Sequence, residues 1–299
     1  MKKKSLTLTI ISNMTSNYGE GLGNVSTVQK IYREGKVYAT RSRESLKNAI
    51  MVESGMYDDL VVTVDGATQK DVSKERNVSN CRALEGGYMN TAVGQNKQTY
   101  IRNSSFYLTD AISCEPFRVD SRFHNNLYLA STYAAANGIN LQEKGGAKKA
   151  GLMPYNYEYD KSLKIYSITI DLSMVGKDEN FNTESSVEEK IERVIRILNA
   201  IENLNLIVKG NLDNAEPIFI IGGLSPRMTH IFENTVRVKE NKLYISKDLK
   251  NKINEGYYVG LLEGDNLDNE LEIINTLNPL SVGEVFSKLK DDVKNYYEV

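Results

Sequence analysis

The chain has 299 residues, of which 40% are hydrophobic, and a net charge of −2. This length and apolar content suffice for a folded core and exclude a fibrous, disordered or small disulfide-stabilised protein. The only cysteines, Cys81 and Cys114, and the only histidines, His124 and His230, form no metal-ligand motif, so we expect neither a structural metal nor a cofactor. No apolar run is long enough to cross a membrane, which predicts a soluble, cytoplasmic protein.

Charge is unevenly distributed along the chain. Residues 1–50 carry nine Lys and Arg against three Glu, a net of +6, and residues 70–150 carry a net of +4. Residues 251–299 carry a net of −6. Clustered cations suit a phosphate backbone, and the acidic end offers a contact for the basic regions of another copy. Ordinary scatter of surface charge is an alternative explanation of the acidic end.

The first 51 residues predict a strand, a polar loop and a basic helix start. Alternating apolar residues predict a half-buried strand over 5–13, and a loop rich in Gly and Asn follows. A short extended piece at 37–39 leads to Ser42, the expected N-cap of a helix that carries Leu46, Ala49 and Ile50 on one face. This order presents amides and cations to phosphates. A flexible loop beside a solvated basic face is the alternative.

Two irregular segments interrupt the regular pattern. Between residues 57 and 120 only 60–64 and 104–108 read as strands, so we expect an inserted lobe. Residues 137–160 are rich in Gly and Lys and end in Met153, Tyr155, Tyr157 and Tyr159, which predicts a protruding arm. Met153 and Tyr155 suit stacking on bases, or packing against a neighbouring subunit.

Regular structure returns in the second half. Alternation over 163–172 predicts a strand, and Ser185 with Glu188 predicts a capping box that opens an amphipathic helix. Residues 218–221 read as a buried strand ended by Gly222 and Gly223, with further strands at 243–245 and 257–262 and a last helix beginning at Ser281. The order strand, helix, interruption, strand, helix, strand predicts an α+β fold, an RRM- or ferredoxin-like sheet with large insertions.

Candidate chemistry points to binding rather than catalysis. The early glycines fit neither GxGxxG nor the Walker pattern. The expected loop from Gly222 to His230 offers Ser225 and Arg227 as donors to phosphate, or it is a tight turn before a helix that starts at Pro226. Residues 1–57 contain no Asp, and Glu20 is the only carboxylate of the early loop, a poor basis for hydrolysis.

The residues predicted to contact a nucleic acid share a polar or cationic side chain in the basic segments or the glycine loop, or lie at the end of the arm. They are Asn17, Asn24, Lys30, Lys36, Arg41, Ser42, Arg43, Lys47, Lys144, Lys148, Lys149, Met153, Ser225 and Arg227. We expect that reversing the charge of Arg41, Arg43 and Lys47 together abolishes retention of nucleic acid while the chain still folds.

Several of these stretches together resemble one family. The segment Asn17 to Met51, Gly87-Tyr88-Met89, Arg102-Asn103-Ser104 and Gly222-Gly223-Leu224-Ser225-Pro226 resemble, in order, the DevR-type backbone subunit of CRISPR Cascade, the Cas-seven family of type I-B systems. Ala111-Ile112-Ser113 with Pro116-Phe117 adds to the likeness. The chain departs from the family at Ala83-Leu84-Glu85-Gly86, where related chains tend to show Asp-Leu-Phe-Gly.

The resemblance implies an RRM-like palm (1–57 and 161–299), a finger insertion (58–133) and a thumb-like arm (134–160). It implies that copies of the chain stack along a CRISPR guide RNA, contact other Cascade subunits, and meet the target DNA strand through the guide. Related type III subunits cut RNA with an Asp after the first strand, so the lack of Asp here favours a non-catalytic subunit of antiviral defence. An RNA endonuclease and a standalone regulatory protein are the alternatives.

Overall fold

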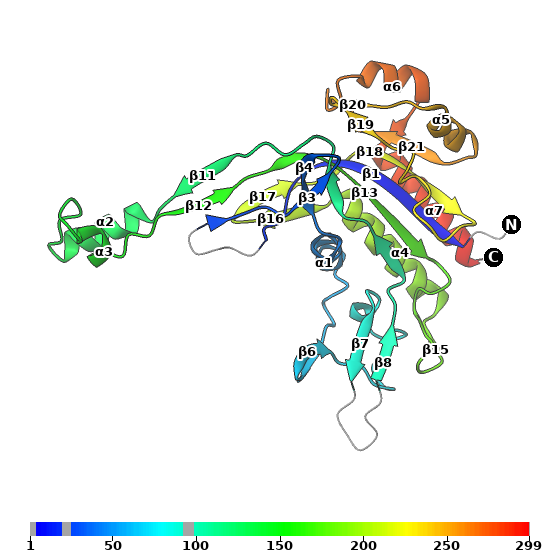
Figure 1. Cartoon of the computed structure of the whole chain (residues 1–299). Helices are drawn as coiled ribbons and strands as arrows, with labels where there is room; N and C mark the ends of the chain where they lie inside the picture. Colours follow the sequence, from blue (N-terminus) through cyan, green and yellow to red (C-terminus); the bar gives the residue numbers. More distant parts are fainter. Residues whose placement is uncertain (1–3, 20–24, 92–98, 299) are drawn as a thin grey trace.

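The computed structural model describes residues 4–19, 25–91 and 99–298. Its centre is one large, mostly antiparallel sheet around strand β1 (Ser5–Thr15), which pairs on one side with β13 (Lys161–Asp171) and on the other with β18 (Pro217–Ser225) (Figure 1). The sheet order is β22-β21-β18-β1-β13-β10-β4-β3, and β9 pairs with β13 beside β10. The outer strands are β3 (Lys30–Arg33), β4 (Lys36–Arg41), β9 (Phe106–Leu108), β10 (Ala111–Ser113), β21 (Tyr258–Leu261) and β22 (Leu280–Ser281).

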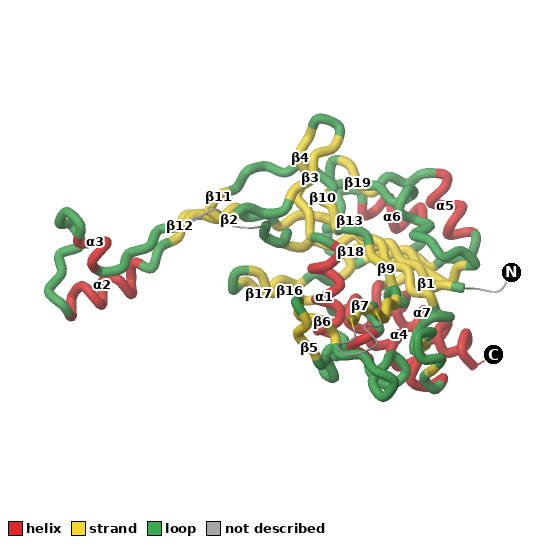
Figure 2. Tube along the Cα trace, turned by 60° about the horizontal axis from the view of Figure 1, so that its bottom comes forward, coloured by secondary structure: helices red, strands yellow, loops and turns green. Residues whose placement is uncertain are grey.

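Three helices cover one face of the sheet. They are α1 (Arg43–Glu53), α4 (Val187–Glu202) and α7 (Val282–Glu298), and they lie together on that side in Figure 2. Their apolar stripes bury Ile50, Leu198 and Phe286 against Leu8 of β1 and Ile168 of β13 in one continuous core. The 3.6-residue spacing of these side chains is what makes each helix present one apolar face to the strands.

The other face is partly covered by a smaller C-terminal lobe. It contains β19 (Val238–Lys239), β20 (Lys242–Leu243), α5 (Lys247–Asn254) and α6 (Glu270–Leu277), and its core packs on Phe219 and Ile221 of β18. Polar side chains of the sheet pair beneath it, as in the contact of 2.6 Å between the Thr9 and Ser167 hydroxyls. For this reason β1 is buried on both faces, whereas its alternating pattern predicted a half-buried strand.

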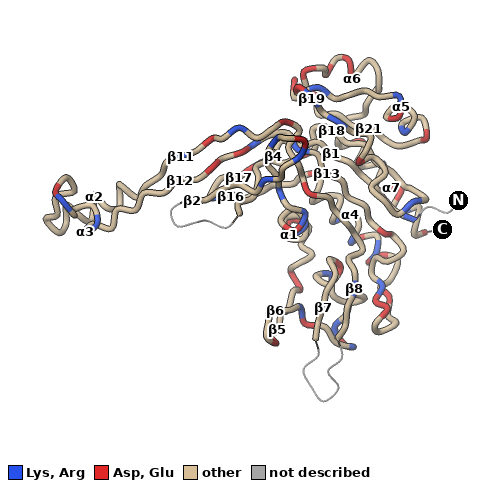
Figure 3. The backbone as a smooth tube through the Cα atoms, in the orientation of Figure 1, with Lys and Arg blue, Asp and Glu red and all other residues tan. Residues whose placement is uncertain are grey.

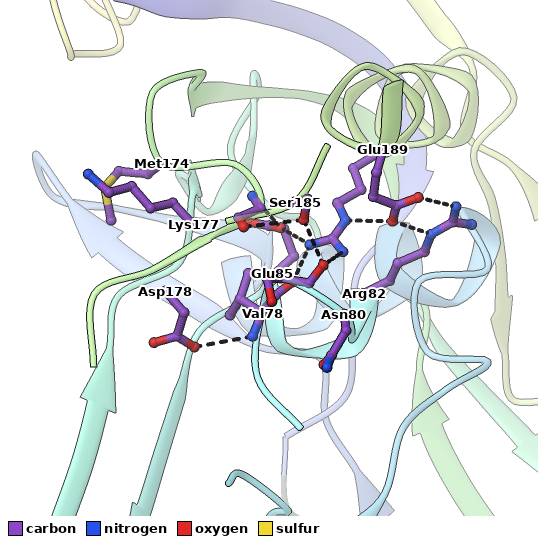
Figure 4. A network of polar contacts seen from close by, with 12 residues as sticks. Val78, Asn80, Arg82, Glu85, Met174, Lys177, Asp178, Ser185 and Glu189 are labelled. Carbon is purple, nitrogen blue, oxygen red and sulfur yellow. Dashed lines mark hydrogen bonds and ion pairs between the residues drawn. The ribbon is translucent and has the colours of Figure 1, made fainter. Parts of the chain in front are cut away.

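The segment after α1 forms a separate lobe that we call the finger (58–104). It holds two hairpins, β5 (Val62–Asp65) with β6 (Ala67–Lys70) and β7 (Tyr88–Thr91) with β8 (Thr99–Arg102), and the short 3-10 turn Arg82–Leu84. Buried acids at its base hold it to α4 and to the short hairpin β14 (Lys177–Asp178) and β15 (Thr183–Glu184), as Figure 4 shows. Glu85 accepts from Arg193 of α4, and Asp178 accepts from the Val78 amide.

An extended ribbon, here called the arm (118–160), projects from the sheet (Figure 1). Strand β11 (Ser121–His124) pairs with β12 (Tyr155–Glu158), the tip holds α2 (Leu127–Ala136) and α3 (Gly146–Lys149), and β2 (Val25–Ser26) joins β12 in parallel. The expected boundary between residues 133 and 134 therefore falls inside α2. The hairpin of β16 (Asn205–Val208) and β17 (Asn211–Asn214) lies near the root of the arm.

The structure confirms most of the expected elements and corrects two. The N-cap of α4 is Ser186 and not Ser185, because the Ser186 hydroxyl accepts from the Glu189 amide while the Ser185 hydroxyl donates to the Ser79 carbonyl. Strand β18 does not end at Gly222. It pairs with β1 up to Ser225, so the expected glycine loop is a strand here. No helix in the described part of the chain is long and apolar enough to span a membrane.

Candidate nucleic-acid interface

The end of β1 meets the start of α1, and several predicted residues gather there. The Asn17 side-chain oxygen accepts from the Ser42 amide at 2.8 Å, and the Ser42 hydroxyl accepts from the Ser45 amide at 3.2 Å. Ser42 is thus the N-cap that the sequence predicted. Both side chains already serve to hold the strand end and the helix start together. Asn24 and Glu20 lie outside the described residues.

Arg41 is buried beneath this junction, with 4% of its surface exposed. Its Nε donates to the Thr15 carbonyl at 3.1 Å and Nη1 donates to the Ser45 hydroxyl at 2.9 Å, while Nη2 has no hydrogen-bond partner among the described residues. Burial lowers the pKa of Arg41 to about 10, and the charge of Asp213 opposes that shift. Arg41 therefore stabilises the fold by linking the end of β1 to the first turn of α1, and reversing its charge would disrupt the fold.

Arg43 is an exposed cation at this junction, whereas Lys36, which is also exposed, lies at the other end of β4. The Arg43 amide donates to a carboxylate oxygen of Asp110 at 2.8 Å, and its guanidinium lies 2.8 Å from Glu44. The Asp110 carboxylate thus already accepts from the first amide of α1, at the N-terminal end of the helix, where a negative charge is favourable. The Arg43 side chain is 63% exposed and its pair with Glu44 is a weak surface contact. It remains available to a phosphate.

Lys47 lies in a cleft of about 650 Å³ between α1 and the base of the finger. Its ammonium donates to the Gly86 carbonyl at 2.7 Å and lies 4.9 Å from the centre of the Phe106 ring. Burial, and to a lesser extent the charge of nearby Lys70, lowers the pKa of Lys47 to about 8. Lys70 donates to the Ala83 and Gly87 carbonyls, and burial lowers its pKa to about 8 as well.

These two lysines make stability depend on pH. Between about pH 8 and 10.5 the unfolded chain keeps protons that folded Lys47 and Lys70 have released, so the free energy of unfolding should rise with pH in this window. Lys47→Met should reduce the slope, whereas Lys250→Met, on the exposed side of α5, should leave it unchanged. Urea unfolding at pH 7.5 and 9.5 measures both. Equal slopes in the Lys47→Met variant and the unchanged protein would contradict the assignment.

The remaining predicted cations lie in other places. The Lys30 ammonium lies 2.6 Å from Glu158 and 5.0 Å from the centre of the Phe117 ring, so it secures the arm root. Exposed side chains gather at the arm tip, where Figure 3 shows the basic residues of α3. They are Lys144, Lys148, Lys149 and Met153.

Ser225 and Arg227 are far from this junction. Ser225 is 1% exposed and lies opposite Ser5, at the other end of β1 from Thr15. Ten residues of extended strand separate these ends by roughly 33 Å. The Ser225 hydroxyl accepts from the Arg227 amide at 3.0 Å. Of the segment from Gly222 to His230, the lining of the cleft beside α1 includes His230 but neither Ser225 nor Arg227.

The sequence reasoning missed residues that the fold brings to the cleft and to the arm. Lys70 and Arg102 come from separate finger hairpins, and Tyr18 and Lys209 meet at the arm root, with the Lys209 ammonium 5.0 Å from the Tyr18 ring centre. Nothing local in the sequence links these positions. The alternation of Tyr155, Tyr157 and Tyr159 was a usable signal, because residues two apart share one face of a strand. Within the described ranges no three His, Cys, Asp or Glu residues gather as metal ligands.

Comparison with known proteins gives the family. Residues 6–248 match the family described as CRISPR-associated negative auto-regulator DevR/Csa2. The fold resembles a solved chain titled "CRISPR RNA-guided surveillance complex, pre-nicking", with a TM-score of 0.55 and 10% identity over 87% of this chain and 93% of that one. Another, titled "CRISPR RNA-guided surveillance complex", has a TM-score of 0.47 and 11% identity over 87% and 90%. No curated protein matches in sequence. The family match spans most of the chain, and the chain therefore belongs to the DevR/Csa2 family of CRISPR-associated proteins.

Proposed function

We propose that this chain is a non-catalytic backbone subunit that binds the guide RNA of a type I, I-B surveillance complex in the cytoplasm. Its central sheet is an RRM-like palm, and the finger and arm are its inserted lobes. The strand order β18-β1-β13-β9, with α1 after β1 and α4 after β13, supports the RRM-like palm, because this order matches a ferredoxin-like βαββαβ unit.

The observation that carries the proposal is the cationic cleft beside α1. Arg43 and Lys47 lie one helical turn apart on α1 and both line the cleft, with the glycines Gly86 and Gly87 on its finger side. Gly87 has a φ of +87°, and a Cβ there would lie 2.9 Å from the Ser104 amide nitrogen, so only glycine fits. Two cations above a narrow backbone turn suit contacts to consecutive phosphates of a single strand.

Copies of the chain would line up along the guide, with other subunits at its ends, and the target DNA strand would be read by pairing with the guide. The lack of Asp in residues 1–57 supports a subunit that holds RNA without cutting it. An RNA endonuclease would instead show metal-dependent cleavage of bound target that is lost on Glu20→Ala.

The test is a charge reversal at the two cations that line the cleft, Arg43, which is exposed, and Lys47, which is partly buried. Arg43→Glu combined with Lys47→Glu should weaken guide RNA binding and lower the slope of log affinity against log salt by about 2. Arg41 stays unchanged because it is buried. The matched control is Lys247→Glu with Lys250→Glu, which makes the same charge change on exposed positions of α5. Equal loss of RNA binding in the two variants would mean that net charge alone causes the loss, and this result would contradict a binding site on α1.

The family description also names a negative auto-regulator, which favours a standalone regulatory protein as the second candidate. Purification from cells that express the guide separates the two. A subunit bound to RNA supports the proposal, and an RNA-free monomer would favour the regulator.

A further inference from the structure

The amine of Lys47 is held in one position in the wall of the cleft beside α1. Its Nζ donates to the Gly86 carbonyl at 2.7 Å and lies 4.9 Å from the centre of the Phe106 ring. All three residues line the cleft. A neutral amine has two hydrogens and one lone pair, so the carbonyl and the face of the ring account for both hydrogens. The lone pair is the position on this nitrogen that remains for a reaction partner.

A large share of the Lys47 amine is neutral near pH 8. Burial first, and then the charges of Lys70 and Arg102, lower the pKa of Lys47 to about 8, while the charge of Glu44 opposes them. Roughly half of these amines are then unprotonated at pH 8, compared with fewer than about 1% for a lysine with the ordinary pKa near 10.4. Only the unprotonated amine attacks an acyl carbon. The cleft therefore presents a nucleophile at a pH where an ordinary lysine is almost wholly charged.

Arg43 adds a group that binds anions, one helical turn away. It lines the same cleft, and its side chain is 63% exposed. Its guanidinium meets the exposed Glu44 carboxylate at 2.8 Å, a pairing that solvent weakens. Side chains four residues apart on a helix are neighbours, so a phosphate group held by Arg43 lies beside the Lys47 amine. The cleft thus combines a phosphate-binding group with a nucleophile, the two groups that a reaction with an acyl phosphate requires.

Lys70 provides a comparison within the same molecule. Burial lowers its pKa to about 8 as well. Its Nζ, however, donates to the Ala83 and Gly87 carbonyls at 2.7 and 3.0 Å, and it lies 5.5 Å from the centre of the Tyr57 ring. Two carbonyls and a ring surround this nitrogen, and Lys70 is not among the described residues that line the cleft. Lys70 therefore shares the low basicity of Lys47 but lacks both the cleft and a cation like Arg43 placed to bind the reagent there.

We propose that Lys47 is acylated directly by acyl phosphates in the cleft beside α1. Arg43 binds the phosphate group, and Lys47 Nζ forms a bond to the acyl carbon while the bond from that carbon to the phosphate oxygen breaks. The amine proton passes to the released phosphate, so the products are an N-acyl lysine and inorganic phosphate. The reaction removes a charge that the proposed function assigns to RNA binding, and its effect on RNA, unlike the reaction itself, rests on that function.

Acetyl phosphate is the probe, and peptide mass spectrometry of the full chain follows acetylation of each lysine with time at pH 8. Lys47 should react at least about 10-fold faster than Lys250, which is exposed on α5, because more of the Lys47 amine is neutral. It should also react faster than Lys70. Arg43→Gln should slow acetylation of Lys47 by about 5- to 10-fold, the effect of one lost contact to phosphate. Lys247→Gln makes the same charge change on α5 and should leave the rate unchanged.

An acetyl donor without phosphate separates the roles of Arg43 and Lys47. The N-hydroxysuccinimide ester of acetic acid carries no phosphate for Arg43 to bind, so Arg43→Gln should leave its rate at Lys47 unchanged. Equal slowing with both reagents would mean that the substitution disturbs Lys47 itself, and would overturn the role of Arg43. Acetylation of Lys47 by acetyl phosphate no faster than that of Lys250 or Lys70 in the unchanged protein would overturn the site.

Guide RNA binding is then measured on the acetylated protein. Loss of one cation from the cleft should weaken binding and lower the slope of log affinity against log salt by about 1. Rapid acetylation of Lys47 with unchanged RNA binding would support the modification site and contradict the proposed function at Lys47. Slow acetylation of Lys47, together with loss of RNA binding in the variant that combines Arg43→Glu with Lys47→Glu, would overturn the modification site and leave the proposed function standing.

Discussion

Glu85→Ala should lower the free energy of unfolding by about 3–5 kcal/mol, the cost of breaking a buried ion pair from one side. Glu85 is fully buried, and one carboxylate oxygen accepts from Arg102 at 3.1 Å while the other accepts from Arg193 at 2.8 Å and from the Gly176 amide at 3.0 Å. Arg102 belongs to the finger and Arg193 to α4. Removal of the acid leaves the buried Arg102 guanidinium without a carboxylate partner among the described residues, and it leaves buried Arg193 with Glu189 alone, at 2.8 Å.

Urea unfolding measures this effect, and Glu192→Ala is its control. Glu192 pairs with Arg196 on α4 at 2.7 Å, but both side chains are more than a third exposed, so the loss should stay under about 1 kcal/mol. We also expect protease cleavage within the finger to become faster in Glu85→Ala, because that lobe loses its main buried link to α4. Equal stability of the two variants would show that the network of Figure 4 does not hold the finger.

Lys164→Met should have a comparable effect at the root of the arm. The Lys164 side chain is fully buried, and its ammonium donates to Asp160 at 2.6 Å, to the Met14 carbonyl at 2.8 Å and to the Ser162 hydroxyl at 2.9 Å. Methionine fills the space but leaves Asp160, which is only 10% exposed, without its cation. We expect a loss of about 3–5 kcal/mol in the free energy of unfolding.

The double variant Lys164→Met with Asp160→Asn separates charge from packing. Once the carboxylate is neutral, its unpaired burial no longer opposes folding, so the double variant should recover part of the lost stability. A double variant as unstable as the sum of its single changes would instead mean that the two residues act independently. Thermal unfolding of the four proteins completes the cycle.

Periodic patterns were enough to predict the regular frame. Strand β1, strand β13 and helix α7 all lie where alternation or a 3.6-residue repeat placed them, because each repeat extends over a single long element. Helix α7 begins directly after Ser281, as expected, and the Ser281 amide donates to Glu284 at 2.9 Å. The α+β class follows from these elements, because the regular spacing of their apolar residues is enough to identify each of them as a strand or a helix.

The bounds of short elements and the contacts between distant residues could not be predicted from the sequence. Gly222 was taken as a strand end, yet a Cβ there would lie 3.0 Å from the Thr7 carbonyl, so glycine is required by close packing inside β18. The choice between Ser185 and Ser186 as N-cap depends on which hydroxyl the finger already uses. Both outcomes are set by a partner far away in the chain, which no local pattern contains.

The candidate site was predictable only in part. The junction of Asn17, Ser42 and α1 was found because cap and helix are local, but the burial of Arg41 was not, since its partner Thr15 lies on another strand. One signal was present at Glu85, where the resemblance to the family led us to expect Phe: a charged residue at an apolar position needs a buried counter-charge. Arg102 and Arg193 supply it from 17 and 108 residues away.

The two edges of the central sheet limit how copies of this chain can join. One edge is β22, only two residues long, and the other is β3, which carries Lys30 and Arg33 and turns back through Glu34 and Gly35, both at positive φ. Short or charged edges resist pairing with a further strand. These edges therefore disfavour fusion of the sheets of two copies into one ribbon. In the proposed assembly, copies would meet through side chains of the lobes, and the spacing between them would follow the bound strand instead of a fixed hydrogen-bond register.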